Sequence, residues 1–197
     1  MKIGVFGGTF DPPHAAHLAL AEAALEQLEL DEVMFLPAFR NPLKLRGRPA
    51  SAPHRLAMVK LLTEGQPKFS VSDIEIERRG KSYAYDTMSD LVEVRPAEYW
   101  FLMGGDALRT FQEWKRPDKL VRLCRLGVAL RPPYHKEDLL IRLSPDIAAR
   151  VDFVEMPPSD ISSTDIRDRL AMRRSLVGII PDSVLSYIQS HGLYQAE

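Results

Sequence analysis

Short apolar runs alternate with longer stretches in which apolar and polar residues recur at helical spacing, along almost the whole chain. The apolar runs contain no internal proline, which is typical of strands that helices cover on both faces. We expect these strands at Lys2–Phe6, Glu32–Leu36, Tyr99–Met103, Arg125–Leu130 and Val151–Val154.

The stretches between the apolar runs predict helices. We expect them at Ala15–Leu28, Pro53–Thr63, Tyr85–Val94, Ala107–Phe111, Pro117–Leu123, Lys136–Leu143, Thr164–Ala171 and Asp182–His191, and a further short strand or edge segment within Phe69–Arg79. Strands that alternate with helices form βαβ units. The sequence therefore predicts an α/β fold with a doubly wound parallel sheet and helices on both faces. We expect residues 1–197 to form one domain with a short helical C-terminal extension from about residue 164.

Polar segments follow each of the five expected strands. These segments are Gly7–His17, Pro37–Lys44, Gly104–Asp106, Arg131 and Met156–Thr164. In parallel α/β sheets, ligands bind outside the carboxyl ends of the strands. The five segments are therefore expected to meet at one edge of the sheet.

The segment from Gly7 to His17, Gly-Gly-Thr-Phe-Asp-Pro-Pro-His-Ala-Ala-His, carries the strongest chemical signal. Adjacent glycines let a ligand approach the backbone closely, and the start of the next helix presents N–H groups to phosphate oxygens. We expect His14 and His17, three residues apart, on one helical face where both point at such a phosphate. The dinucleotide-binding pattern G-x-G-x-x-G and the P-loop pattern are both absent. The other histidines are scattered, which argues against a zinc site.

A second segment, Ile161–Arg167, offers hydroxyl groups, a helix start and an arginine. Ser162, Ser163 and Thr164 could cap the helix and donate to a ligand, and the planar guanidinium of Arg167 matches phosphate oxygens bidentately. Serine and threonine also cap helices for structural reasons alone. That alternative stays open for this segment taken by itself.

Composition narrows the class of protein. A formal net charge of -1 argues against binding nucleic acid mainly by charge. The single cysteine, Cys124, excludes an internal disulfide and is expected to be a buried thiol. We see no signal peptide and no apolar run of membrane-spanning length, so we expect a cytoplasmic protein without a membrane partner.

Together, the two motifs resemble the G-T-F-D-P-x-H-x-x-H and I-S-S-T-x-I-R signatures of a nucleotidyltransferase superfamily, in the same order and context. The likeness is greatest to bacterial nicotinate-nucleotide adenylyltransferases and extends over nearly the whole chain. The resemblance implies a Rossmann-like fold and an enzyme of NAD biosynthesis, which joins ATP and nicotinate mononucleotide to give nicotinate adenine dinucleotide and pyrophosphate. It also implies Mg²⁺ carried by the ATP phosphates, with no metal held by the protein alone.

The resemblance further implies roles for individual residues. Catalytic roles fall to His14, His17, Lys44 and Arg167. ATP binding falls to Gly7, Gly8, Thr9, Phe10, His17, Gly104, Asp106, Ser162, Ser163, Thr164 and Arg167. Acceptor binding falls to Lys44, Tyr83, Ala84, Thr87, Asp106, Trp114, Lys115 and Arg131.

Three segments carry the acceptor assignment. Ser82–Thr87 resembles the family's S-Y-T-x-x-T, with alanine in place of one threonine, and there backbone amides bind the pyridine carboxylate. Phe111–Pro117 resembles F-x-x-W-x-x-P, whose tryptophan stacks on the pyridine ring, although Trp114 could instead be an ordinary core residue. The family's P-P-H-K reads Asn41-Pro42-Leu43-Lys44 here, which keeps the lysine but leaves Leu43 no phosphate role. A merely solvated basic loop over Arg40–Arg55 is the alternative.

Other functions remain open at this level. The same transfer could use nicotinamide mononucleotide or another phosphorylated acceptor, although the pyridine-pocket likeness argues against phosphopantetheine. A non-catalytic dinucleotide-binding sensor is the alternative of another class. The sequence leaves open whether the chain forms a homo-oligomer.

Overall fold

The computed structural model describes residues 1–43, 49–130, 132, 134–157, 159 and 161–195 of the chain. It contains a sheet of six parallel strands in the order β3-β2-β1-β4-β5-β6. The strands are β1 Lys2–Gly8, β2 Glu32–Pro37, β3 Phe69–Val71, β4 Glu98–Gly104, β5 Arg125–Leu130 and β6 Val151–Glu155. The order places β1 and β4 at the centre, where the chain switches direction across the sheet. This is the predicted doubly wound, Rossmann-like α/β fold.

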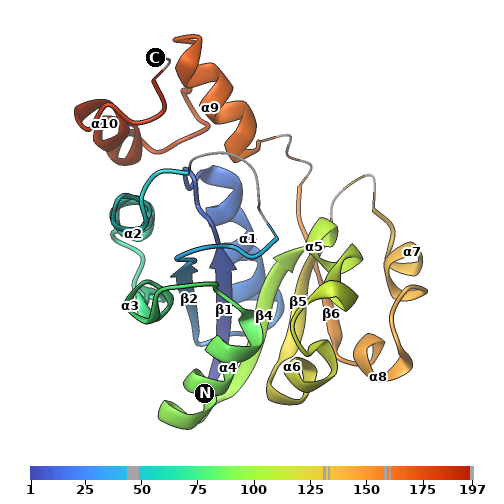
Figure 1. Ribbon diagram of the computed structural model, residues 1–197. Coiled ribbons are helices and arrows are strands. Elements are labelled where there is room, and N and C mark those ends of the chain that lie inside the picture. Colours follow the sequence, from blue (N-terminus) through green and yellow to red (C-terminus); the bar gives the residue numbers. More distant parts are fainter. Residues whose placement is uncertain (44–48, 131, 133, 158, 160, 196–197) are drawn as a thin grey trace.

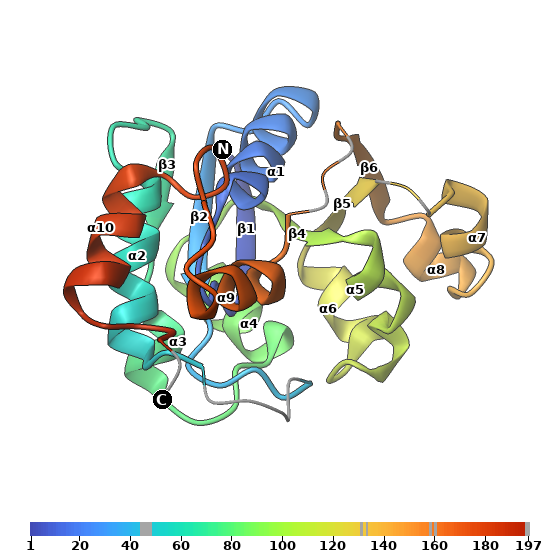
Figure 2. The same cartoon turned by 90° about the horizontal axis from the view of Figure 1, so that it is seen from above.

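Helices cover both faces of the sheet (Figures 1 and 2). They are α1 Ala15–Gln27, α2 Ala52–Thr63, α3 Ile74–Arg78, α4 Ala84–Val94, α5 Gly105–Arg109, α6 Pro117–Leu123, α7 Lys136–Leu140, α8 Pro145–Ala148, α9 Ser163–Ala171 and α10 Asp182–Ser190, with a short 3₁₀ helix, η1, at Phe111–Glu113.

Alternation along each strand builds two hydrophobic cores. In β2, Val33 and Phe35 pack with α1, α2 and α10, whereas Met34 and Leu36 face the core that includes residues of α4, α5 and α6. Successive side chains of a strand point to opposite faces, so each buried strand supplies both layers. Gly127 in β5 is part of this packing, because a Cβ there would lie 2.6 Å from Leu102 Cδ2.

Most expected elements are present within one or two residues of the expected bounds, and three differ. Phe69–Arg79 contains the short strand β3, but Ile74–Arg78 forms the helix α3. The helix expected at Ala107–Phe111 begins at Gly105, ends at Arg109 and is followed by η1. The helix expected to reach Leu143 ends at Leu140, and Pro145 opens the separate helix α8. Proline is favoured at the first position of a helix, so its place marks this new start.

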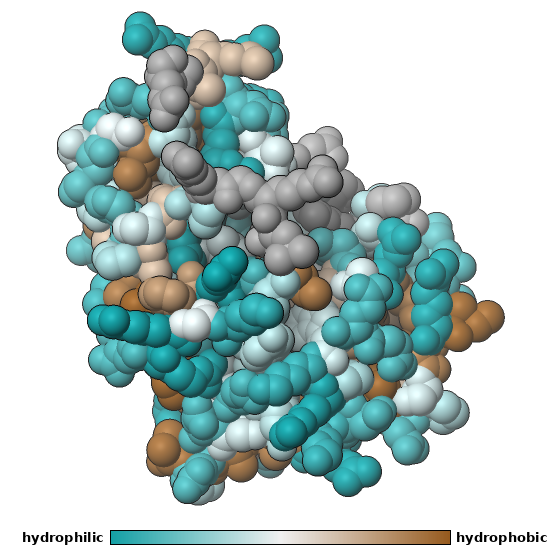
Figure 3. Space-filling model, in the orientation of Figure 1, coloured by the Kyte–Doolittle hydropathy of each residue, from teal (hydrophilic) through white to brown (hydrophobic). Residues whose placement is uncertain are grey.

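The C-terminal helices α9 and α10 lie beyond the carboxyl ends of the central strands (Figure 1). A direct bond ties this region to the start of α1, because Ala15 N–H donates to the Ile179 carbonyl at 3.0 Å. Hydrophobic side chains show only in small separate patches on the mainly hydrophilic face seen in Figure 3. Across the described ranges, no helix has both the length and the apolar character that a membrane crossing requires.

Candidate active site

A cavity of about 1010 Å³ lies at the carboxyl ends of the strands and is open to solvent. Four of the five polar segments expected at this edge line it through residues that the structure describes. These residues lie within Thr9–His17, within Phe39–Leu43, at Gly104 and Asp106, and at Met156, Pro157, Ser159 and Ile161–Thr164. The fifth expected position, Arg131, lies outside the described residues, as does Lys44. The convergence expected from the strand pattern is therefore confirmed for the segments that the structure describes.

The turn after β1 is shaped by close approach of two aromatic rings. A Cβ on Gly7 would lie 2.9 Å from Phe101 Cζ, and one on Gly8 would lie 2.9 Å from Phe10 Cζ. Phe10 has a positive φ of 51°. Its side chain is buried, with 2% of its surface exposed. Thr9 lines both this cavity and a second one, and its buried Oγ1 has no hydrogen-bond partner in the described part of the chain. A ligand oxygen could satisfy that hydroxyl.

His14 and His17 lie together, but not on one helical face as expected. His14 is the N-cap of α1 with extended backbone angles, φ −153° and ψ 173°, and His17 is the third residue of the helix. Their rings nevertheless stack with centroids 3.7 Å apart, and both line the large cavity. The His14 backbone N–H donates to His17 Nδ1 at 3.2 Å. Because Nδ1 accepts, a neutral His17 ring carries its proton on Nε2.

The second motif holds the first one in place. Ser162 caps α9 by accepting from the Asp165 N–H at 3.1 Å, which is a common N-cap bond. Ser163 Oγ donates to the Pro12 carbonyl at 3.0 Å, and Arg167 Nη1 donates to the Asp11 carbonyl at 2.7 Å. Two segments that are about 150 positions apart are thus bonded side by side.

Arg55 is a buried organiser of the site and not part of a solvated basic loop. Only 2% of its surface is exposed. Its guanidinium donates to the carbonyls of Thr9 at 2.8 Å, Ala38 at 2.6 Å, Phe39 at 3.0 Å and Ala50 at 2.9 Å. Burial lowers the pKa of Arg55, and nearby Asp11 opposes that shift. The alternative of a solvated loop is wrong for this residue, which joins the turn after β1, the segment after β2 and the start of α2.

A second cavity of about 300 Å³ adjoins the first and brings together several of the residues expected to bind the acceptor. It is lined by Tyr83, Ala84, Trp114 and Lys115, among others. Trp114 packs edge-on against Phe101, with centroids 5.7 Å apart, and no described group bonds its buried Nε1. Tyr83 is the N-cap of α4 and makes no side-chain cap bond, and the first residues of that helix, Ala84 and Tyr85, line the cavity with it. A helix N-terminus favours an anionic group.

Two of the expected acceptor residues are engaged by neighbours. Lys115 Nζ pairs with the Asp86 carboxylate at 2.7 and 2.9 Å and lies 4.7 Å from the centre of the Tyr83 ring. Thr87 is fully buried and does not line the cavity. Its hydroxyl donates to Glu75 Oε1 at 2.7 Å, and Glu75 does line the cavity. The structure therefore places Thr87 behind the pocket wall.

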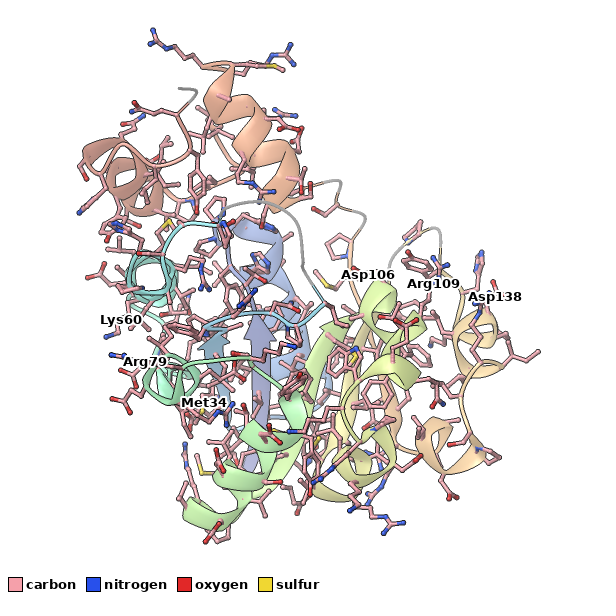
Figure 4. The ribbon with its side chains drawn as sticks, in the orientation of Figure 1. Met34, Lys60, Arg79, Asp106, Arg109 and Asp138 are labelled. Carbon is pink, nitrogen blue, oxygen red and sulfur yellow. The ribbon has the colours of Figure 1, made fainter. Side chains whose placement is uncertain are left out.

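Asp106 lies at the border between the two cavities. It is the second residue of α5, at the end of β4 (Figure 4), and lines both cavities. A Cβ on Gly104 would lie 2.6 Å from Asp106 Oδ1. Glycine at position 104 therefore leaves the room that the Asp106 carboxylate occupies.

Several residues that hold the site together had no assigned role from the sequence. They are Asp11, Arg55, Glu75 and Tyr194. Asp11 lies inside the first motif, which is a signal that could have found it. Tyr194 lies far from both motifs, and only the fold brings it to Asp11.

Comparison with known proteins defines the class. The model of the cytidylyltransferase-like family matches residues 5–169. A solved structure described as Plasmodium falciparum nicotinic acid mononucleotide adenylyltransferase complexed with NaAD has a TM-score of 0.81, over 98% of this chain and 97% of that chain. Its sequence identity is 20%, so this likeness concerns the fold.

Sequence relatives narrow the class further. A protein of Oceanobacillus iheyensis named "Probable nicotinate-nucleotide adenylyltransferase" is 38% identical, over 98% of this chain and 96% of its own length. A protein of the same name from Exiguobacterium sibiricum is 43% identical, over 98% and 99%. The chain therefore belongs to the cytidylyltransferase-like family and, within it, to the nicotinate-nucleotide adenylyltransferases.

Proposed function

We propose that this protein transfers the adenylyl group of ATP to nicotinate mononucleotide, giving nicotinate adenine dinucleotide and pyrophosphate. The single observation that carries this proposal is the pair of adjoining cavities, one lined by both signature motifs and the other by Trp114 and the start of α4. The large cavity has the room and the hydrogen-bond donors for a nucleoside triphosphate. The small one is suited to a flat aromatic acid.

The reaction is an in-line displacement at the α-phosphorus of ATP. The 5′-phosphate of the acceptor is already an anion at neutral pH, so it can attack without a general base. An oxygen–phosphorus bond forms to the acceptor as the bond to pyrophosphate breaks. The work left to the protein is to align two anions and to neutralise the charge that builds on the leaving group.

His17 and Arg167 are suited to this work. Because Nδ1 of His17 accepts the His14 N–H, the donor of a neutral His17 ring is its Nε2–H group. Arg167 is partly exposed and lines the cavity while one of its nitrogens holds the Asp11 carbonyl. We assign both to the triphosphate, together with His14. Lys44 keeps its expected catalytic and acceptor-binding roles by its place after Asn41-Pro42-Leu43, and it lies outside the described residues.

Mg²⁺ belongs to the substrate in this proposal. The ion prefers phosphate and water oxygens in an octahedral arrangement, so ATP enters as its magnesium complex. The described residues bring no three His, Cys, Asp or Glu side chains together in a group that could hold a metal ion. When bound, Mg²⁺ would neutralise triphosphate charge, and the side chains named above would orient the same phosphates.

A direct assay tests the function. Purified protein is incubated with MgATP and nicotinate mononucleotide, pyrophosphate release is followed, and the dinucleotide is identified by mass spectrometry. We expect release that depends on both substrates. A protein that binds the dinucleotide without releasing pyrophosphate would be the non-catalytic sensor and would contradict the proposal.

A further inference from the structure

The C-terminal segment reaches the site through a side chain outside both motifs. After α10, Gly192 and Tyr194 have left-handed backbone conformations, with φ values of 60° and 61°. The side chain of Tyr194 packs against the core and its hydroxyl donates to Asp11 Oδ1 at 2.7 Å. Burial, and then the bond to Asp11, raises the pKa of Tyr194 above its ordinary value. The hydroxyl therefore stays protonated and remains a donor at neutral pH.

The Asp11 carboxylate is shared among several groups. It is 7% exposed, and a carboxylate so deeply buried needs partners. Oδ1 accepts from Tyr194 and from the Ala50 N–H at 2.9 Å. Oδ2 lies 3.7 Å from Arg167 Nη1, which is too far for a hydrogen bond. Arg167 Nη1 instead donates to the Asp11 backbone carbonyl at 2.7 Å.

This arrangement leaves Asp11 and Arg167 close together without a direct side-chain hydrogen bond. An arginine beside a carboxylate normally forms a two-point, charge-assisted pair with it. Such a pair would occupy N–H groups of the guanidinium in the cavity that Arg167 and Asp11 both line. The donors on Asp11 Oδ1 hold the carboxylate in the orientation that prevents this.

We propose that Tyr194 is a positioning residue, which holds Asp11 so that Arg167 stays available to the phosphates of ATP. The inference rests on the proposed function of Arg167 as a phosphate ligand. It assigns the C-terminal segment a part in nucleotide binding. Loss of the hydroxyl would let the Asp11 carboxylate rotate onto Arg167 and compete with the triphosphate for it.

Tyr194→Phe tests the proposal, because it removes only the hydroxyl and keeps the ring in its packing. Tyr187→Phe is the matched control. It removes a hydroxyl of α10 that lies 2.9 Å from His54 Nδ1 and has no part in the site. We expect Tyr194→Phe to raise the KM for ATP by about 10-fold, with little change in the KM for nicotinate mononucleotide. A merely structural role would lower kcat and leave both KM values unchanged.

A double-mutant cycle tests whether Tyr194 acts through Arg167. In the Arg167→Ala background, Tyr194→Phe should have no further effect on ATP binding. Calorimetry with a non-hydrolysable ATP analogue gives the same comparison without turnover, and its stoichiometry reports the folded fraction. An unchanged Kd in Tyr194→Phe, or an equal loss in both backgrounds, would overturn the inference. If the wild type binds the analogue but turns over no nicotinate mononucleotide, the proposed function fails, while the Kd comparison still decides the role of Tyr194.

Discussion

At the scale of single residues, the two signature histidines have different positions and therefore different tasks. His14 is 4% exposed and forms the N-cap of α1, whereas His17 lies in the first turn. Their stacked rings bring the two side chains together. The backbone bond at Nδ1 places the proton of a neutral His17 ring on Nε2, and this N–H group is the donor that we assign to the triphosphate.

We expect His17→Ala to reduce kcat by about 100- to 1,000-fold, the usual cost of removing one preorganised donor. The fold should persist, because the His17 side chain is only partly buried and lines a cavity. Steady-state kinetics together with thermal unfolding check this. His54→Ala is the matched control and should keep nearly normal turnover, because His54 packs against Tyr187 of α10 and lines neither cavity. Normal kcat in folded His17→Ala would remove His17 from the mechanism.

At the scale of elements, packing between a strand and its neighbours makes glycine necessary at position 127. A Cβ there would lie 2.6 Å from Leu102 Cδ2 and 3.1 Å from Leu28 Cδ1. Leu102 is fully buried and has little room to move. We expect Gly127→Ala to lower the free energy of unfolding by about 1–3 kcal/mol, as overpacked cores do. Denaturant unfolding measures this loss.

Combining Leu102→Val with Gly127→Ala tests whether overlap with Leu102 causes the loss of stability. Leu102→Val shortens the side chain that the new methyl group would meet, so the double variant should lose less than the sum of the single losses. Additive losses would mean that the overlap with Leu102 is not the source of the strain. Gly65→Ala, where a Cβ meets no atom within 4 Å but φ is +78°, separates backbone strain from overpacking.

The thiol of Cys124, at the end of α6, should be unreactive toward thiol reagents in the folded protein. Burial raises the pKa of this thiol to about 12 from 9.0, and only the thiolate reacts with disulfide reagents. We expect no labelling by Ellman's reagent at pH 8 until the protein is unfolded. Since the unfolded thiol ionises first, stability should also begin to fall as the pH rises above 9.0 toward about 12. Rapid labelling of native protein at pH 8 would contradict this.

The sequence predicted the buried strands better than the short helix α3 and the burial of individual polar side chains, and each difference has a physical reason. Apolar runs identify buried strands because the side chains of each strand pack into a hydrophobic core on both faces of the sheet. All five expected strands are present. The helix α3 was missed because its five residues, Ile74–Arg78, are too few to show a helical period. The burial of Arg55 was also missed, since its partners are backbone carbonyls from three segments, and a sequence pattern does not show such bonds. Lys44 and Arg131 stay predictions.

At the scale of the whole molecule, the sheet topology brings two unlike cavities together. β1 and β4 lie side by side at the centre of the sheet, where the strand order reverses. The carboxyl ends of the strands at this point are the usual place for a ligand in such folds. Asp106, Asn41 and Thr9 line both cavities. The reacting phosphates would meet along this shared border, with the adenylyl donor on one side and the pyridine ring on the other.

This division predicts that the acceptor preference is set in the small cavity and is independent of ATP. We expect nicotinate mononucleotide to be preferred over its amide analogue. The N-terminus of α4 lines the cavity and favours an anion, whereas the NH₂ of the amide would oppose the N–H groups there. Leaving a buried donor unpaired costs about 1–3 kcal/mol, or about 5- to 150-fold in kcat/KM.

Competition kinetics with both mononucleotides measure this preference. Trp114→Ala should raise the KM for the pyridine substrate more than the KM for ATP, because the indole lines the small cavity and not the large one. Lys115→Met should narrow the preference for the acid, since its ammonium group borders the same cavity. Lys119→Met, which removes the charge of an exposed lysine on α6, is the matched control and should leave the preference unchanged. Equal kcat/KM for the acid and the amide would refute the acid-selective pocket, and adenylyl transfer itself would still stand.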